Sequence, residues 1–381
     1  MSIVKFSDVA HRVNTKEDRF DTDKIYYVGG EHIDTNELIV TSNGLIKGST
    51  IGPMFYCGFK HGDILFVTRN PHLRKCGLVE FDGICSEKTF VIGTKDTTVL
   101  TQEYLAVVMQ SDDFWNYCEE NKSGGVNYFL NWSTLAEYEF DLPPMEEQIS
   151  ISKKVFAAYR LKQSYQKLIA ATDEMVKSQF IEMFGNPLSQ EQKYPMRKLS
   201  ECCIINPRRT SVCLKDSDYV SFVPMPSVSE NGTLQDVMDE EYGEVKKGFT
   251  YFENNDVLFA KITPCMENGK GAIAHSLTNG IGMGSTEFHI LRPIKGLSNP
   301  YWLLCLTRMP IFRKLAEKNM SGTGGQKRVG AAFLENFMIG LPPIEAQNTF
   351  EELYKQADKS KFELRKSIDA IDQVIKSLIN N

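Results

Sequence analysis

The chain has 381 residues, 42% hydrophobic and 24% charged, a composition typical of globular proteins with more than one hydrophobic core. Its net charge of −6 excludes a uniformly positive surface of the kind that attracts nucleic acid, although local basic loops remain compatible with it. No run of about 18 apolar residues occurs, and "MSIVKFSDVAHR" lacks a signal-peptide core, so we expect a cytoplasmic protein with no membrane partner.

The first predicted domain, residues 1–141, has the pattern of an irregular β-rich fold. Short β-branched and aromatic runs such as "KIYYVGG", "DILFVT" and "EKTFVIG" are separated by Gly, Asn and Asp and predict strands. "TQEYLAVVMQSDDFWNYCEE" predicts one helix after them. The segment carries 13 Lys and Arg against 21 Asp and Glu, so only local groups of basic residues stand out in it.

Basic and amide side chains follow the buried strand "DILFV" on a proline-bearing loop, and another precedes the glycines of "SGG". Arg and Lys pair with guanine edges, Asn pairs with adenine, and all of them hold phosphates. The alternative interpretation is a solvated turn with incidental charge. The candidate DNA contacts of this domain are Arg69, Asn70, His72, Arg74, Lys75 and Lys122.

A long helix is predicted over residues 142–187, beginning at the motif "LPPMEEQ". Pro144 suits the first helical turn, where a missing N–H costs nothing, and the following glutamates favour the positive end of the helix dipole. Apolar residues then recur at spacings of three and four, and Gly185 is suited to end the helix. The residues expected to form this helical spine and to dock other subunits are Leu142, Pro143, Pro144, Gln148, Ile151, Val155, Ile169 and Val176.

The second predicted domain, residues 188–340, repeats the plan of the first. "NDVLFAKI" lies 193 residues after "GDILFVTR", "YVSFVP" and "STEFHIL" predict strands, and "PYWLLCLTRMPIFRKLAEK" predicts one helix. A period this long indicates duplication of a whole domain, not a solenoid repeat. Its candidate DNA contacts lie on the corresponding loop, on "NPRRTS" and on the glycine-rich turn: Arg208, Arg209, Lys261, Thr263, Asn268, Lys270, Thr323, Lys327 and Arg328.

A second long helix is predicted over residues 341–381, starting at "LPPIEAQ", 199 residues after the first motif. Its apolar stripe has coiled-coil spacing, so we expect the two helices to pair with each other, the alternative being that each packs on its own domain. A helix of about 39 residues is roughly 58 Å long. The expected spine and docking residues here are Leu341, Pro342, Pro343, Gln347, Leu353, Leu364, Ile371 and Val374.

These motifs together resemble the DNA sequence-specificity (S) subunit of type I restriction–modification systems. The resemblance rests on both L-P-P-x-E-x-Q helices, on "SGGVNYFLNWSTLAEYEFDLPPMEEQ" and "SGTGGQKRVGAAFLENFMIGLPPIEAQ", and on "MFGNP". It implies an α+β fold of two β-rich target recognition domains joined by two long antiparallel coiled-coil helices, with pseudo-twofold internal symmetry. It also implies that each domain reads one half of a bipartite, asymmetric double-stranded DNA site, and that two methyltransferase (modification) subunits and restriction/translocase subunits assemble on the chain.

No enzyme site is found in the sequence. "SGTGGQK" is not a phosphate-binding loop because Gln326 separates the glycine from the lysine, and "NPYW" lacks the second proline of an amino-methyltransferase box. The six histidines and nine cysteines show no metal-ligand or triad spacing. We therefore expect a non-catalytic chain without its own cofactor or metal, with S-adenosylmethionine and ATP/Mg bound by partner subunits. The alternatives are the specificity subunit of a type IIB-like system, an N6-adenine methyltransferase with a fused recognition domain, and a protein-binding coiled-coil scaffold.

Overall fold

The computed structural model describes residues 2–186, 193–209, 213–323 and 325–380. It divides into two compact units, which we call unit 1 (Met1–Leu168 with Leu364–Asn381) and unit 2 (Ile169–Glu363). Both are mixed α and β structures with several sheets. The predicted boundary between residues 187 and 188 lies outside the described residues.

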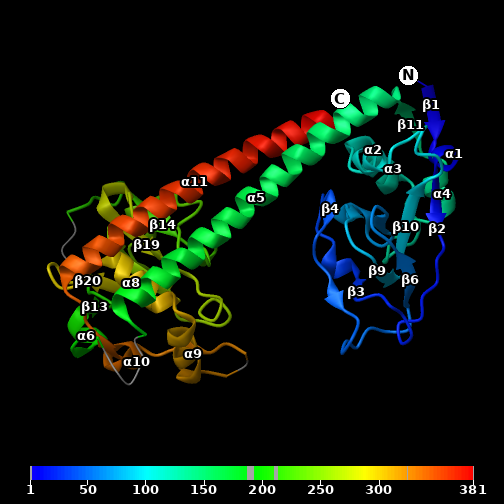
Figure 1. Ribbon diagram of the computed structural model, residues 1–381. Coiled ribbons are helices and arrows are strands. Elements are labelled where there is room, and N and C mark those ends of the chain that lie inside the picture. Colours follow the sequence, from blue (N-terminus) through cyan, green and yellow to red (C-terminus); the bar gives the residue numbers. More distant parts are fainter. Residues whose placement is uncertain (1, 187–192, 210–212, 324, 381) are drawn as a thin grey trace. The chain divides into compact units, whose positions relative to one another are not determined.

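Unit 1 is built on two main sheets, with strand orders β2-β10-β7-β8-β4 and β5-β3-β9-β6 (Figure 1). A separate pair, β1 and β11, joins the N-terminus to the strand that precedes the first LPP motif. The strands are β1 Ser2–Lys5, β2 Ala10–Val13, β3 Tyr26–Val28, β4 Ile39–Val40, β5 Gly44–Leu45, β6 Phe55–Phe59, β7 Ile64–Val67, β8 Cys76–Val79, β9 Gly83–Ser86, β10 Thr89–Thr94 and β11 Glu139–Leu142. The helices are α1 Phe6–Val9, α2 Gln102–Val108, α3 Asp112–Glu120 and α4 Trp132–Ala136, with 3-10 turns η1 Gly30–His32 and η2 Pro71–Leu73.

Unit 2 has two four-stranded sheets, with orders β13-β20-β17-β18 and β15-β14-β19-β16 (Figure 1). The strands are β12 Met196–Lys198, β13 Cys203–Ile205, β14 Tyr219–Val223, β15 Met238–Glu241, β16 Thr250–Glu253, β17 Val257–Ala260, β18 Gly271–Ile273, β19 Ile281–Gly284, β20 Phe288–Pro293, β21 Met320–Ser321, β22 Arg328–Val329 and β23 Met338–Gly340. The helices are α6 Leu199–Cys202, α7 Tyr242–Val245, α8 Pro300–Arg308, α9 Pro310–Lys318 and α10 Ala331–Asn336, with η3 Met225–Ser227 and η4 Thr278–Gly280.

The strand orders of the two units correspond position by position. The run β2-β10-β7-β8 matches β13-β20-β17-β18, and β5-β3-β9-β6 matches β15-β14-β19-β16. One parallel pair also corresponds, because β3 runs parallel to β9 and β14 runs parallel to β19. The fifth strand of the larger sheet in unit 1, β4, runs parallel to β8 and has no counterpart among the described strands of unit 2. The internal repeat seen in the sequence is therefore a repeat of topology, and all the strands named from the sequence are present.

The prediction of one helix before each glycine-rich turn is wrong, because each half has two. In unit 1 the first helix, α2, ends at Val108, and Ser111 caps the next helix, α3, by accepting a hydrogen bond from Phe114 N. In unit 2 the break falls at Pro310, which has no N–H to continue the preceding helix. In each half the second helix buries aromatic side chains in the core of its own unit, among them Trp115 of α3 and Phe312 of α9.

The two long helices are α5 Met145–Phe184 and α11 Ile344–Asn380. Gly185, with φ of 78°, follows the end of α5 as the sequence predicts. Within unit 1, Lys162 of α5 forms an ion pair with Asp372 of α11 at 2.5 Å. Within unit 2, Phe180 of α5 packs edge-on against Phe350 of α11, with ring centroids 5.3 Å apart. Residue numbers rise along one helix as they fall along the other, so these contacts are antiparallel.

Both interpretations of the long helices hold in part, because each helix also packs on a domain core. Val155 and Val176 of α5 are buried among the core residues of unit 1 and unit 2 respectively. One expected stripe residue is wrong: Val374 is 52% exposed, and the neighbouring Ile375 packs on the core of unit 1 instead. At this end of α11 the buried face of the helix is therefore rotated from the predicted one, because the face that is buried is the one that covers the core of unit 1.

The glutamine of each LPP motif is buried and cannot dock another subunit, which corrects that expectation for Gln148 (1% exposed) and Gln347 (0% exposed). Gln148 donates to the carbonyls of Val99 and Pro143 and accepts from Thr101 N. Gln347 makes the corresponding three bonds, donating to Leu297 and Pro342 and accepting from Asn299 N. In both halves this amide ties the start of the long helix to the start of the helix that follows β10 or β20.

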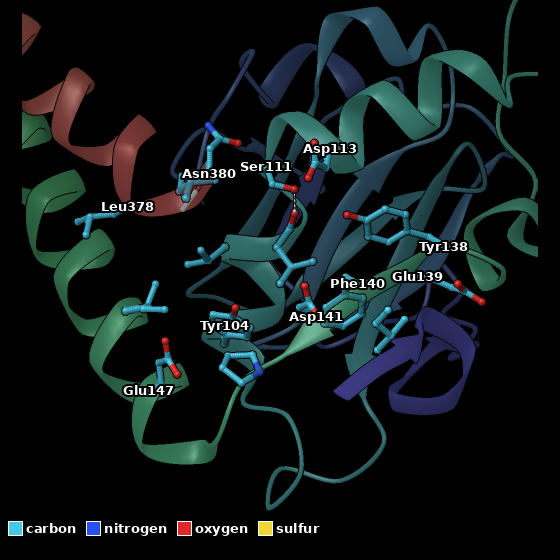
Figure 2. A pocket seen from close by; sticks show the side chains of 16 residues that line it. Tyr104, Ser111, Asp113, Tyr138, Glu139, Phe140, Asp141, Glu147, Leu378 and Asn380 are labelled. Carbon is cyan, nitrogen blue, oxygen red and sulfur yellow. Dashed lines mark hydrogen bonds between the residues drawn. The ribbon is translucent and has the colours of Figure 1, made fainter. Parts of the chain in front are cut away.

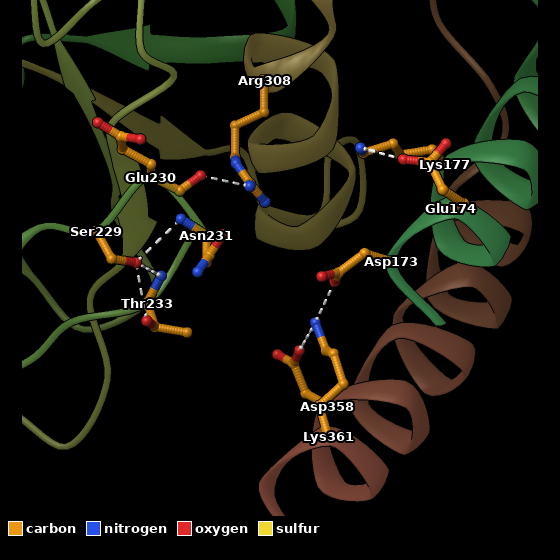
Figure 3. Close-up of polar contacts among 10 residues, drawn as sticks. All are labelled: Asp173, Glu174, Lys177, Ser229, Glu230, Asn231, Thr233, Arg308, Asp358 and Lys361. Carbon is orange, nitrogen blue, oxygen red and sulfur yellow. Dashed lines mark hydrogen bonds and ion pairs between the residues drawn. The ribbon is translucent and has the colours of Figure 1, made fainter. Parts of the chain in front are cut away.

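A buried ion cluster links α5 and α11 inside unit 2 (Figure 3). Lys361 of α11, 5% exposed, places its Nζ 2.8 Å from Asp173 Oδ1 of α5 and 2.8 Å from Asp358 Oδ1 of its own helix. A buried ammonium requires such partners, since its desolvation is costly. The cluster therefore favours one register of the two helices in this unit.

Candidate nucleic-acid interface

In unit 2 the loop after β17 and the glycine-rich turn form one joined surface. Thr263 N donates to Lys327 O at 3.0 Å, Val329 N donates to Lys261 O at 2.9 Å, and Lys327 N donates to Thr263 Oγ1 at 3.1 Å. Two predicted groups of contacts, 64 residues apart in sequence, thus share one surface. The exposed backbone near Gly325 and the basic side chains beside it are suited to phosphate.

Unit 1 makes the same connection at the corresponding positions. Asn70 N donates to Tyr128 O at 3.0 Å, and Leu130 N donates to Thr68 O at 3.0 Å. These pairs match those of unit 2 after shifts of 193 and 199 residues, the shifts found between the two sequence copies. The fold therefore places one loop-and-turn surface in each unit. We call these the unit 1 loop pair (residues 68–75 with 122–130) and the unit 2 loop pair (residues 261–270 with 321–329).

Aromatic rings in the unit 1 loop pair hold its basic side chains. The Arg69 guanidinium lies 5.1 Å from the centre of the Phe129 ring, and Lys122 Nζ lies 4.5 Å from that of Tyr128. The two rings thus position the two cations.

Several candidate side chains are already engaged within the protein. Arg74 pairs with Asp112 of α3 at 2.7 Å, and this hydrogen bond holds the pKa of the Asp112 carboxyl below its usual value. Arg328 pairs with Glu287 at 2.7 Å and likewise lowers the pKa of that carboxyl. The others donate as follows: Lys75 to Gly30 O, Lys122 to Glu119, Asn268 to Glu230 and Lys270 to Met225 O. These residues shape the loops before any ligand arrives.

The side chains of Asn70, His72, Lys261, Thr323 and Lys327 make no hydrogen bond, ion pair or ring contact with the residues that the structure describes. Among the candidates of the two loop pairs, these are the ones free to meet a ligand. Arg208 and Arg209 lie on another segment, where Arg209 donates to Lys246 O at 2.9 Å. The adjoining Thr210 and Ser211 of "NPRRTS" lie outside the described residues.

Two residues that shape the unit 2 loop pair were missed in the sequence. Arg313 of α9 is 5% exposed, and its guanidinium donates to Met266 O at 2.7 Å and to Lys270 O at 3.4 Å. Burial lowers its pKa to about 9. Glu287, the partner of Arg328, is the other. Neither has a local signal, because each acts across more than 40 residues of sequence on a loop that only folding brings near.

A cavity of 490 Å³ in unit 1 is unsuited to DNA (Figure 2). The carboxylates of Asp113, Glu139, Asp141 and Glu147 line it, and none of its lining residues is Lys, Arg or His. These charges would repel phosphate. Elsewhere in the described residues, no cluster of three or more His, Cys, Asp or Glu is arranged to hold a metal ion. No described helix combines the length and apolar character needed to cross a membrane.

Comparison with known proteins finds similarity over about half of the chain. Residues 191–372 match the family described as type I restriction modification DNA specificity domain. Over 186 residues (48% of this chain) the sequence is 38% identical to the Escherichia coli type I restriction enzyme EcoEI specificity subunit. Over 169 residues (43% of this chain) it is 39% identical to the EcoAI specificity subunit of the same organism. These alignments span only 31% and 29% of the relatives' own lengths.

A solved structure shares the fold over nearly the whole chain. The type I restriction–modification system S subunit from M. genitalium aligns over 99% of this chain and 94% of its own, with a TM-score of 0.59 and 10% identity. At that identity the likeness concerns the fold alone. The curated relatives confirm the family resemblance inferred from the sequence, and they support neither a fused methyltransferase nor a type IIB-like system.

Proposed function

We propose that the chain is the DNA-recognition subunit of a type I restriction–modification system, because residues 191–372 match the type I restriction modification DNA specificity domain. The observation that carries the proposal is the repeated loop pair, which occurs in both units after the corresponding strands β7 and β17. Two similar but not identical readers suit a bipartite, asymmetric target. Each unit would read one half-site by base contacts and hold the adjoining phosphates with its lysines and arginines.

We further propose that the two recognition domains are joined by the long helices acting as an antiparallel coiled coil. The support is local: the ion pairs Lys162–Asp372 and Asp173–Lys361 each join the two helices within a unit. A helical connection of fixed length would leave an unread spacer of fixed length between the half-sites. The related ends of such a helix pair suit two copies of one methyltransferase subunit.

The chain itself would carry out no chemistry. S-adenosylmethionine and ATP/Mg would be bound by the methyltransferase and restriction/translocase subunits, and the assembly would work in the cytoplasm. The overall acidity of the chain is compatible with this role, because partner subunits can supply further phosphate contacts.

A domain exchange tests the proposal. The full chain is expressed with a methyltransferase subunit, and the methylated sequence is read by methylome sequencing. We expect a bipartite motif, and replacing residues 1–141 with the first domain of another specificity subunit should change one half-site only. A continuous motif, or a change in both half-sites, would refute the division of labour. Methyl transfer by the purified chain alone would overturn the non-catalytic assignment.

A further inference from the structure

Arg313 is a buried cation without an acidic partner. It lies on α9 among core residues of unit 2, and no carboxylate among the described residues forms an ion pair with it. Its Nε atom is buried and has no hydrogen-bond partner among the described residues. Burying a charge in this way is costly, so the contacts that the guanidinium does make have to offset that cost.

Those contacts all concern the unit 2 loop pair or the strand that leads into it. The two terminal nitrogens donate to Met266 O and Lys270 O, and the guanidinium lies 4.6 Å from the centre of the Phe259 ring in β17. The planar guanidinium can serve two carbonyls and a ring face together, which the single ammonium of a lysine cannot do. Arg313 thus attaches the far end of loop 261–270 to α9.

The attached loop carries four of the candidate DNA contacts: Lys261, Thr263, Asn268 and Lys270. Its outer side is joined to the glycine-rich turn, whereas its inner side rests on Arg313. A second contact restrains the loop, because the Asn268 side chain donates to the Glu230 carboxylate. The backbone carbonyl of Glu230 in turn accepts a hydrogen bond from Arg308 of α8 (Figure 3). Positive charge held beneath a loop in a poorly polarisable interior also acts more strongly on a bound anion than the same charge in water.

Unit 1 secures its corresponding loop from the corresponding helix by other means. Arg74 is the loop residue there, and Asp112 of α3 is its partner. The cation comes from the loop in unit 1 and from the helix in unit 2, where its partners are backbone carbonyls instead of a carboxylate. A helix-to-loop attachment is therefore common to the two units, although its chemistry is not.

We propose that Arg313 is a positioning residue for DNA recognition by unit 2, which fixes loop 261–270 for base and phosphate contact and places a positive charge beneath it. This inference rests on the proposed function. It predicts that the loss of Arg313 relaxes discrimination at one half-site and leaves the other unchanged.

The test compares Arg313→Met and Arg313→Lys with Lys314→Met, a control that removes an exposed charge from the next position of α9. The full chain, assembled with its methyltransferase subunit, is titrated with three duplexes. One holds the methylome-derived target, and each of the others holds one changed base in one half-site. The ratio of Kd values for changed and intact duplexes measures discrimination, and this ratio does not depend on the fraction of folded protein.

For Arg313→Met we expect discrimination at the unit 2 half-site to fall about tenfold, with the other half-site unaltered. Arg313→Lys should lose part of the discrimination at the unit 2 half-site, because lysine keeps the charge but cannot donate to both carbonyls. Lys314→Met should discriminate as well as the unaltered chain. Unchanged ratios in both arginine variants, or equal losses at both half-sites, would overturn the inference. If Arg313→Met does not fold, Arg313→Lys alone decides. An unaltered complex without sequence-specific binding would instead refute the proposed function.

Discussion

At the residue scale, the LPP glutamines show how one side chain can specify a junction. An amide has two donor hydrogens and an acceptor oxygen, and Gln148 and Gln347 each use all of these on backbone groups. Each of them spans about 50 residues of sequence to join a helix start to a loop. A buried side chain whose donors and oxygen are all hydrogen-bonded to the backbone is a structural residue, and this accounts for the recurrence of glutamine in both copies of the motif.

Removing one of these amides should destabilise its unit. Gln347→Ala leaves buried backbone groups without partners, so we expect a loss of about 2–4 kcal/mol in the free energy of unfolding, measured by urea denaturation. Thr349→Ala, an exposed position two residues further along the same helix, is the control and should change stability by less than about 0.5 kcal/mol. A loss in Gln347→Ala no larger than in the control would contradict the structural role.

A buried histidine makes the stability of unit 2 depend on pH. His289 accepts or donates hydrogen bonds at both ring nitrogens, to Asn206 and to Val329 O, and burial lowers its pKa from the usual value of 6.5. The unfolded chain therefore takes up a proton more readily than the folded one. The stability contributed by neutral His289 is present above about pH 6.5 and is lost as the pH falls from there through the folded pKa.

The measurement compares the free energy of unfolding at about pH 7.5 and about pH 5.5. The decrease between these values should be smaller in His289→Gln than in the unaltered chain, because glutamine does not titrate. The pKa of His275, an exposed residue, is also lowered, by partial desolvation of its ring, so the double variant with both histidines replaced should show a smaller decrease still. His72→Gln controls for loss of a histidine from an exposed loop. A decrease in His289→Gln as large as in the unaltered chain would exclude this residue as a source.

At the element scale, the long helices combine two roles that the sequence presented as alternatives. Their apolar stripes pack on the domain cores, through residues such as Val155 and Val176, and on each other, through residues such as Phe350. The helix ends and lengths followed from local signals, namely prolines at the start and Gly185 after the end of α5. The exposure of Val374 could not be predicted from local signals, because it depends on which core the helix covers.

The ion pair between Lys361 and Asp173 should show strong coupling. A double-mutant cycle with Lys361→Ala and Asp173→Ala, read by chemical denaturation, should give a coupling free energy of about 0.5–3 kcal/mol, because Lys361 is buried. The exposed pair Lys177–Glu174 on α5 is the control, expected near or below about 0.5 kcal/mol. Equal coupling in the two pairs would show that the buried cluster does not select the helix register.

At the scale of the whole molecule, the proposed function implies that the length of the long helices sets the length of the unread spacer in the DNA target. Seven residues add about 10.5 Å to a helix, which corresponds to about three base pairs. Insertion of one heptad after Leu168 in α5 and another after Glu363 in α11 respects the division between the units, so the contacts inside each unit are kept. We expect methylome sequencing to show half-sites unchanged and a spacer longer by about three base pairs.

A heptad in α5 alone is the control for this experiment. It leaves the helices unequal in length, so methylation should fall at all sites instead of moving to a new spacing. An unaltered spacer after the double insertion would rule out the helices as the measure of spacing.

Several features could be predicted from the sequence: the duplication, five of the strands, the starts of both long helices and the end of the first, and the loops that carry basic residues. These features depend on neighbours within a few residues or on the comparison of one half of the chain with the other. Both kinds of information are present in a single sequence. The break between α8 and α9 at Pro310 was visible in principle, since proline cannot continue a helix, but the apolar pattern on both sides obscured it.

Folding in three dimensions sets which segments come into contact. It joined Thr263 to Lys327, buried Gln347, engaged Arg74 and Arg328 with carboxylates, and placed Arg313 beneath a loop more than 40 residues away in sequence. The physical reason is that a polar group's partner is set by which segments become adjacent on folding. A lysine that pairs with a carboxylate and one that stays free for a ligand look alike in sequence, and only the folded structure distinguishes them.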